Sequence, residues 1–156
     1  MGLPSKEEKV LELFFNSTKH WHFEELMKKS KLSRGRLNYW LKRLVKEDII
    51  KKVKVRGKMP HYIGNFDSPS YRNRKRLYAL ELFYKTGFRN HLQTHPKAKT
   101  IIIFGSTSRS DWYKDSDVDL LIYGDEDGFE KRYYEKKLSR EIQSFVCKTT
   151  EDFKKF

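Results

Sequence analysis

The sequence has a single cysteine, Cys147, among 156 residues. One thiol excludes an intramolecular disulfide framework and fits a reducing compartment. Its neighbours Phe145 and Val146 are apolar, so we expect the thiol to be buried and inert. Long apolar runs are also absent, and the N-terminal residues MGLPSKEEK lack the apolar core of a signal peptide. We therefore expect a cytoplasmic protein with no membrane partner.

Acidic residues are scarce in the first two thirds of the chain. Residues 1–67 hold 16 Lys and Arg against 8 Asp and Glu, residues 68–98 hold 7 against 1, and residues 99–156 hold 11 against 12. Excess positive charge typically faces phosphate groups, and its uneven distribution indicates two small domains with different functions. Aromatic residues make up 15% of the chain, enough to build hydrophobic cores.

The first part of the chain shows three helical patterns and a hairpin pattern. Ser5 and Glu8 form a capping-box signature before an apolar run, and residues 22–30 (HFEELMKKS) suggest a second helix. Ser33 precedes a third, whose apolar stripe consists of Leu37, Trp40, Leu41, Leu44 and Val45. Residues 50–63 then alternate around an RGK turn, which predicts a hairpin.

Three short helices followed by a basic-tipped hairpin resemble the winged helix-turn-helix domain of many bacterial and archaeal transcription regulators, over residues 1–66. The resemblance implies a recognition helix at residues 33–46 and a wing at residues 51–63, bound to double-stranded DNA. It implies base-edge contacts for Arg34, Arg36 and Asn38, and phosphate contacts for Lys42, Arg43, Arg56 and Lys58, among others. The alternatives are a solvated basic face or a protein-binding winged helix.

Residues 67–97 predict a basic connecting helix that starts at Ser68-Pro69 and ends at Gly87 or at Pro96. It either extends the DNA-binding surface, supports a homodimer, or simply joins the two domains. His91 and His95 are spaced i, i+4 without a neighbouring carboxylate or cysteine, so we expect a surface pair instead of a metal site.

Two carboxylates stand one residue apart at the start of an apolar run in the last third. Asp117 and Asp119 flank Val118 in VDLLI, and strand alternation places both on one face. Negative charge beside a buried strand is costly unless a cation lies between the carboxylates, which predicts a divalent-metal site. A calcium loop starting at Asp115 fails because its sixth position is Leu120, and a Walker A motif lacks its Gly-Lys-Ser/Thr ending.

The run from residue 98 to residue 156 resembles the nucleotidyltransferase superfamily of DNA polymerase β type, in its minimal form. The resemblance rests on a β-branched strand, Gly105-Ser106, ten intervening residues, and then Asp117-Val118-Asp119. It implies that Asp117 and Asp119 bind Mg²⁺ or Mn²⁺, and that Gly105, Ser106 and Arg109 bind the phosphates of a nucleoside triphosphate such as ATP. Active members carry a third acid on a later strand; the matching run REIQSFVCKTTEDF puts Gln143 there, and Glu141 is the candidate substitute base.

Together these features predict an α+β protein with an N-terminal winged-helix domain, a connecting helix and a small mixed-sheet nucleotidyltransferase domain. The first functional hypothesis is a Mg²⁺-dependent enzyme that transfers a nucleoside monophosphate to an unknown hydroxyl acceptor. The second is a DNA-binding transcription regulator whose nucleotidyltransferase domain senses nucleotide without turnover. A third is an antitoxin-like partner of a helical toxin.

Overall fold

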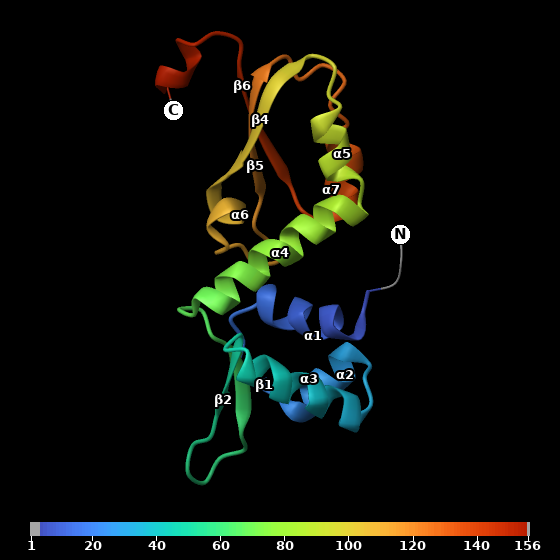
Figure 1. The fold of residues 1–156 in the computed structure, drawn as a ribbon, viewed down its shortest axis with the longest axis vertical. Coiled ribbons are helices and arrows are strands. Elements are labelled where there is room, and N and C mark those ends of the chain that lie inside the picture. The colour runs from blue at the N-terminus through green and yellow to red at the C-terminus, as the bar shows by residue number, and fades with distance from the viewer. Residues whose placement is uncertain (1–3, 156) are drawn as a thin grey trace. The chain divides into compact units, whose positions relative to one another are not determined.

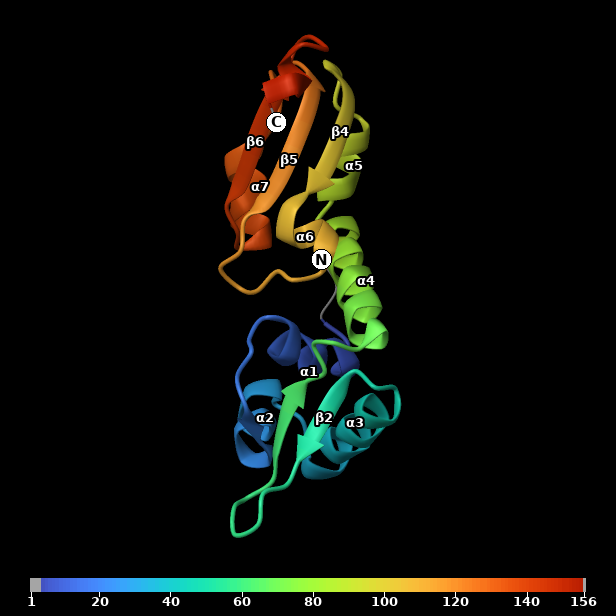
Figure 2. The same cartoon turned by 90° about the vertical axis from the view of Figure 1, so that its left-hand side faces the viewer.

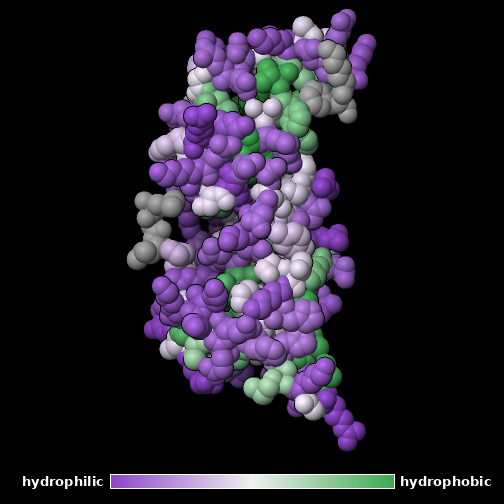
Figure 3. Space-filling view, turned by 180° about the vertical axis from the view of Figure 1, so that it is seen from behind, coloured by the Kyte–Doolittle hydropathy of each residue, from purple (hydrophilic) through white to green (hydrophobic). Residues whose placement is uncertain are grey.

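The computed structural model describes residues 4–155 and divides into two compact units. One unit extends to Lys75 and the other begins at Arg76, so the division falls inside α4 (Pro69–Lys85). None of the helices in the described residues is long and apolar enough to cross a membrane. Hydrophilic side chains cover most of the surface seen in Figure 3.

Three helices open the N-terminal unit, at the places that the sequence patterns predicted: α1 (Lys6–Phe15), α2 (Phe23–Ser30) and α3 (Arg34–Lys46). The capping box at the start of α1 is present in both directions between Ser5 and Glu8. In α3 the apolar stripe faces the core only in part. Leu37, Leu41 and Leu44 are fully buried, whereas Val45 stays 38% exposed.

A small antiparallel sheet completes this unit. The predicted hairpin is formed by β2 (Ile50–Val53) and β3 (His61–Gly64), and a further strand, β1 (Trp21–His22), pairs with β3. The strand order is β1-β3-β2. A two-residue strand is too short to show alternation, so only its pairing with β3 reveals it.

The connecting segment contains two helices, and the first, α4, ends just before Gly87, one of the two predicted ends. Gly87 adopts a left-handed conformation (φ 77°) between α4 and α5 (Phe88–Gln93), which a residue with a side chain rarely adopts. Phe83 and Phe88, on either side of the break, pack edge to face and belong to the core of the C-terminal unit. The residues after the break are therefore part of that unit's core.

The C-terminal unit is built around a three-stranded mixed sheet, as predicted. Its elements follow the order β4 (Ala98–Phe104), α6 (Gly105–Arg109), β5 (Val118–Gly124), α7 (Lys131–Leu138), β6 (Ile142–Cys147) and the 3₁₀ helix η1 (Asp152–Lys155). The strand order is β4-β5-β6, with β4 and β5 antiparallel and β5 and β6 parallel.

The two faces of this sheet differ. Val118, Leu120 and Ile122 are fully buried against residues of α5 and α7, which cover one face in Figure 1. The opposite face, turned towards the viewer in Figure 2, is not covered by those helices, and alternation places Asp119 on it. Cys147 at the end of β6 is a buried free thiol, as expected.

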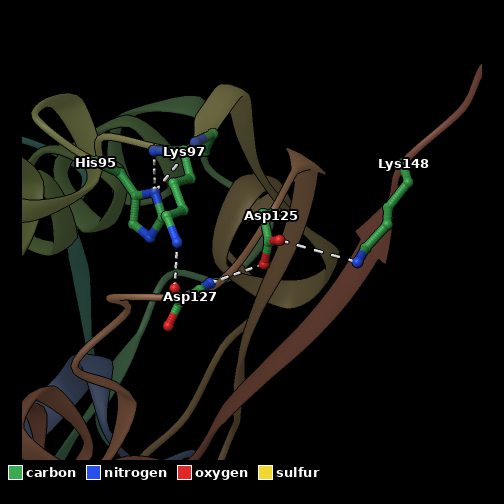
Figure 4. Close-up of polar contacts among 6 residues, drawn as sticks. His95, Lys97, Asp125, Asp127 and Lys148 are labelled. Carbon is green, nitrogen blue, oxygen red and sulfur yellow. Dashed lines mark hydrogen bonds and ion pairs between the residues drawn. The ribbon is translucent and has the colours of Figure 1, made fainter.

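The histidine pair does not lie on the surface, contrary to expectation. His95 is 7% exposed, and its Nδ1 accepts hydrogen bonds from the backbone N–H groups of Lys97 and Ala98 (Figure 4). His91 stacks on Tyr134 instead. Tertiary packing around the sheet's end buries His95 and leaves His91 half-buried, which local spacing cannot predict. The ion pairs Lys97–Asp127 and Asp125–Lys148 join the segments around this end of the sheet.

Candidate nucleotidyltransferase site

The site forms where β4 ends and β5 begins. Phe104, the last residue of β4, is the cross-strand partner of Asp119, and the chain turns directly into α6 at Gly105. Gly105 has φ 66° and lies against the Asp119 carboxylate, so that a Cβ at this position would stand 2.0 Å from Oδ2. Only glycine satisfies both the left-handed backbone and this close approach.

Asp117 and Asp119 interact electrostatically. Both side chains are half-buried. Partial burial raises the pKa of Asp119, the negative charge of Asp117 raises it further, and the positive charge of Arg109 opposes the rise. The structure therefore concentrates negative charge at a place with reduced hydration, which favours a bound cation.

The residues predicted to bind phosphate lie on α6, next to this carboxylate pair. The backbone carbonyl of Ser106 accepts hydrogen bonds from the N–H groups of Ser110 and Asp111 and holds the turn that follows the helix. Arg109 is exposed and forms an ion pair of 3.0 Å with Asp111. Sequence spacing did not single out Asp111, because an i, i+2 pair beside a helix end has no distinctive pattern.

On the other side of β5, the third-acid position carries no acid. The register of the parallel pair sets Gln143 opposite Asp119, so the position that the resemblance assigns to the third acid adjoins this carboxylate. Glu141 stands before the first residue of β6; its backbone carbonyl accepts from the N–H of Val118, and its side chain is exposed. Within residues 4–155 no group of three His, Cys, Asp or Glu side chains is arranged to hold a metal, so Glu141 does not complete the pair in this conformation.

The predicted DNA-contacting residues all lie exposed on the N-terminal unit. They occupy α3 and the turn between β2 and β3: Arg34, Arg36, Asn38, Lys42, Arg43, Arg56 and Lys58. Two of them form ion pairs within the unit. Arg34 pairs with Glu24 at 2.6 Å, and Arg43 pairs with Glu47 at 2.7 Å, which raises the pKa of the Arg43 guanidinium.

A family comparison bears on the C-terminal unit. Residues 88–156 match the family model described as Polymerase beta, Nucleotidyltransferase, and the match does not extend into the N-terminal unit. Comparison with curated proteins and with solved structures gave no match. The matched range starts at residue 88, earlier than the predicted domain start at residue 98, and so includes α5. Residues 88–156, with Gly105 packed on Asp119 beside a mixed sheet, are therefore a polymerase β-type nucleotidyltransferase domain.

Proposed function

We propose that this protein is a divalent-metal-dependent nucleotidyltransferase that moves a nucleoside monophosphate from a nucleoside triphosphate to a hydroxyl group. The observation that carries the proposal is the packing of Gly105 on Asp119 in a domain of this family. That packing places the start of α6 beside the carboxylate pair. Triphosphate oxygens held there and the two carboxylates can therefore bind the same metal ion.

The donor set fits a hard divalent cation. Asp117 and Asp119 supply carboxylate oxygens, the ligands that Mg²⁺ and Mn²⁺ prefer. Burial and then the charge of Asp117 raise the pKa of Asp119, and a bound cation would oppose both effects. When bound, the ion would neutralise charge on the transferring phosphoryl group. One or two protein carboxylates, with substrate phosphates completing the shell, are typical of nucleotide-bound Mg²⁺.

The chain's own residues then have separate roles. Ser106 and Arg109 bind and orient the phosphates, and the acceptor oxygen forms a bond to the α-phosphorus as the bond to pyrophosphate breaks. The acceptor's proton has to leave during this step. Gln143 cannot take it near neutral pH, so Glu141 remains the proposed base, after a movement of its exposed side chain.

The direct test is transfer of label from α-labelled nucleoside triphosphates with Mg²⁺, using cell lysate as a mixed acceptor. We expect Asp117→Asn and Asp119→Asn each to lower transfer by at least about a hundredfold, as loss of a key electrostatic group does. Asp125→Asn is the matched control, because it removes an acid just beyond the other end of β5. Undiminished transfer by both site variants would exclude this site.

A second proposal concerns the N-terminal unit, which we propose to bind double-stranded DNA as a winged helix. It is supported by the seven exposed side chains on α3 and the β2–β3 turn, and by the net charge of residues 1–67, 16 Lys and Arg against 8 Asp and Glu. Electrostatic binding predicts a salt-dependent affinity. An affinity for a DNA duplex that does not change between low and physiological salt would contradict it.

A further inference from the structure

A cation–π contact joins the segment before β6 to the segment that leads to Asp117. The guanidinium of Arg140, just before β6, lies 4.1 Å from the ring centre of Trp112, in the connection between α6 and β5. Trp112 is 1% exposed, and Tyr78 of α4 lies nearly parallel to it with ring centres 6.1 Å apart.

Each partner of this contact is connected to the site through the backbone. Trp112 precedes a turn in which the N–H of Tyr113 donates to Oγ of Ser116, and Asp117 follows directly. Arg140 precedes Glu141, whose carbonyl accepts from the N–H of Val118. Holding Arg140 on Trp112 therefore restrains both ends of the segment that presents Asp117.

The electrostatic surroundings support a permanently placed cation. Burial lowers the pKa of the Arg140 guanidinium, while Tyr78 and Asp115 oppose that change, and the group stays protonated near neutral pH. A partly buried cation on an indole face gains more than an exposed one, because less water competes for it.

We propose that Arg140, through its contact with Trp112, is a positioning residue that holds Asp117 in place for metal binding. This inference rests on the proposed function, because it names the device that aligns the carboxylate pair of that site. Because Arg140 acts through its contact with Trp112, the role proposed for it is to order the loop, not to bind the ligand.

The experiment compares wild type, Arg140→Ala, Arg140→Lys, Trp112→Phe and Lys137→Ala by two measurements. Lys137→Ala is the matched control: Lys137 makes the same kind of contact with Tyr133, at 4.6 Å, on α7. The first measurement is amide hydrogen exchange of residues 110–118. The second is Mn²⁺ binding in the presence of ATP, followed by electron paramagnetic resonance.

We expect Arg140→Ala to speed exchange of residues 110–118 and to weaken Mn²⁺ binding about three- to tenfold, the loss of one cation–π contact. Arg140→Lys keeps the charge without the planar group. Its exchange rate and its Mn²⁺ affinity should lie between those of wild type and Arg140→Ala. Trp112→Phe keeps an aromatic ring and covers the case in which Arg140→Ala does not fold. The Lys137→Ala variant should match wild type in both measurements.

Each contrary outcome has a distinct meaning. Unchanged exchange in the Arg140 and Trp112 variants overturns the proposal, whether or not metal binds. Faster exchange with unchanged Mn²⁺ affinity also overturns it, because the contact would then be purely structural. Faster exchange together with no Mn²⁺ binding by any variant, wild type included, overturns the metal-binding role and the proposed function, and leaves only loop ordering.

Discussion

Gly105 and Asp119 are packed so closely that any side chain at position 105 would enter the space of the Asp119 carboxylate: an added Cβ would stand 2.0 Å from Oδ2. The contact joins the end of β4 to the face of β5 that carries Asp119. A glycine at the entrance of α6 thus sets the position of a carboxylate fourteen residues later in the chain, through a cross-strand pairing.

Gly105→Ala should therefore lower both stability and activity. The left-handed backbone costs about 1–2 kcal/mol for a residue with a Cβ, and the carboxylate must also move. We expect the free energy of unfolding to fall by more than that strain alone, and Mn²⁺ binding to be lost. Thermal unfolding and metal titration measure the two effects.

Gly128→Ala is the control for this variant. Gly128 also has a positive φ, 93°, but nothing lies within 4 Å of the Cβ that alanine would add. The Gly128→Ala variant should lose only the stability that backbone strain costs, and its Mn²⁺ binding should stay intact. Equal effects of the two substitutions on metal binding would show that the Gly105–Asp119 contact does not matter for the site.

Asp119→Asn should stabilise the metal-free protein at neutral pH, by a few degrees in melting temperature, as expected when an unfavourable charge contact worth about 1 kcal/mol is removed. The folded chain holds the Asp119 proton more tightly than the unfolded chain, because burial and Asp117 raise its pKa above 3.8. Wild-type stability is therefore lost as pH rises through the raised pKa.

The advantage of Asp119→Asn should accordingly shrink as pH falls and vanish below 3.8, where the wild-type carboxyl is protonated in both the folded and the unfolded chain. Saturating Mg²⁺ should reverse the order at neutral pH, because only wild type keeps both ligands. Asp125→Asn, whose carboxylate pairs with Lys148, should show neither effect. Melting curves over a range of pH, with and without Mg²⁺, measure these effects. If wild type and Asp119→Asn differed in melting temperature by the same amount at every pH, the raised pKa of Asp119 would not be the cause.

Gln143→Glu should raise nucleotidyl transfer. Gln143 is the partner of Asp119 in the parallel register, so a glutamate there places a third acid beside the pair. We expect a gain of about tenfold or more, at the low end of what a positioned general base contributes, and some loss of metal-free stability from added repulsion.

Gln143→Asn serves as the control, since it disturbs the same position without adding charge. A Gln143→Glu variant that transfers no faster than Gln143→Asn at any pH would show that proton removal does not limit the reaction. The measurement is the initial rate of label transfer at several pH values.

The ion pairs on α3 and its neighbours lead to a prediction about DNA affinity. Arg34 and Arg43 have to leave Glu24 and Glu47 before they contact DNA, whereas neither Arg36 nor Lys42 forms a described ion pair. Arg36→Ala and Lys42→Ala should therefore weaken binding to a duplex about tenfold, a phosphate or base contact each. Arg34→Ala should weaken it less.

Glu24→Gln tests the same idea, because it removes the acid that pairs with Arg34. The freed Arg34 should strengthen DNA binding at low salt. Lys114→Ala, a change in the C-terminal unit, is the control for lost positive charge. Fluorescence anisotropy at several salt concentrations measures all of these. Equal losses from Arg36→Ala and Lys114→Ala would indicate a nonspecific charge effect and would remove α3 as the recognition helix.

Local patterns in the sequence were sufficient for most elements. The capping box at Ser5, the β-branched run before Gly105 and the alternation around Asp119 each involve residues within one helix or strand, and the structure forms those elements where predicted. The Gly105-Ser106 and Asp-x-Asp spacing also identified the nucleotidyltransferase domain. Short-range hydrogen bonding and alternation govern these features, so they appear in the order of residues.

The sequence by itself determined the helices, the first hairpin and the nearness of Asp117 to Asp119, because these follow from periodicity and from neighbouring positions in the chain. The mixed sheet was what the resemblance carried by Gly105-Ser106 and Asp117-Val118-Asp119 implied. Only the tertiary structure decided that Gly105 touches the Asp119 carboxylate, that Arg140 lies on Trp112, that β1 joins the first sheet and that His95 is buried. Those contacts join residues of different elements, and their geometry is set by strand register and core packing, which no local pattern specifies.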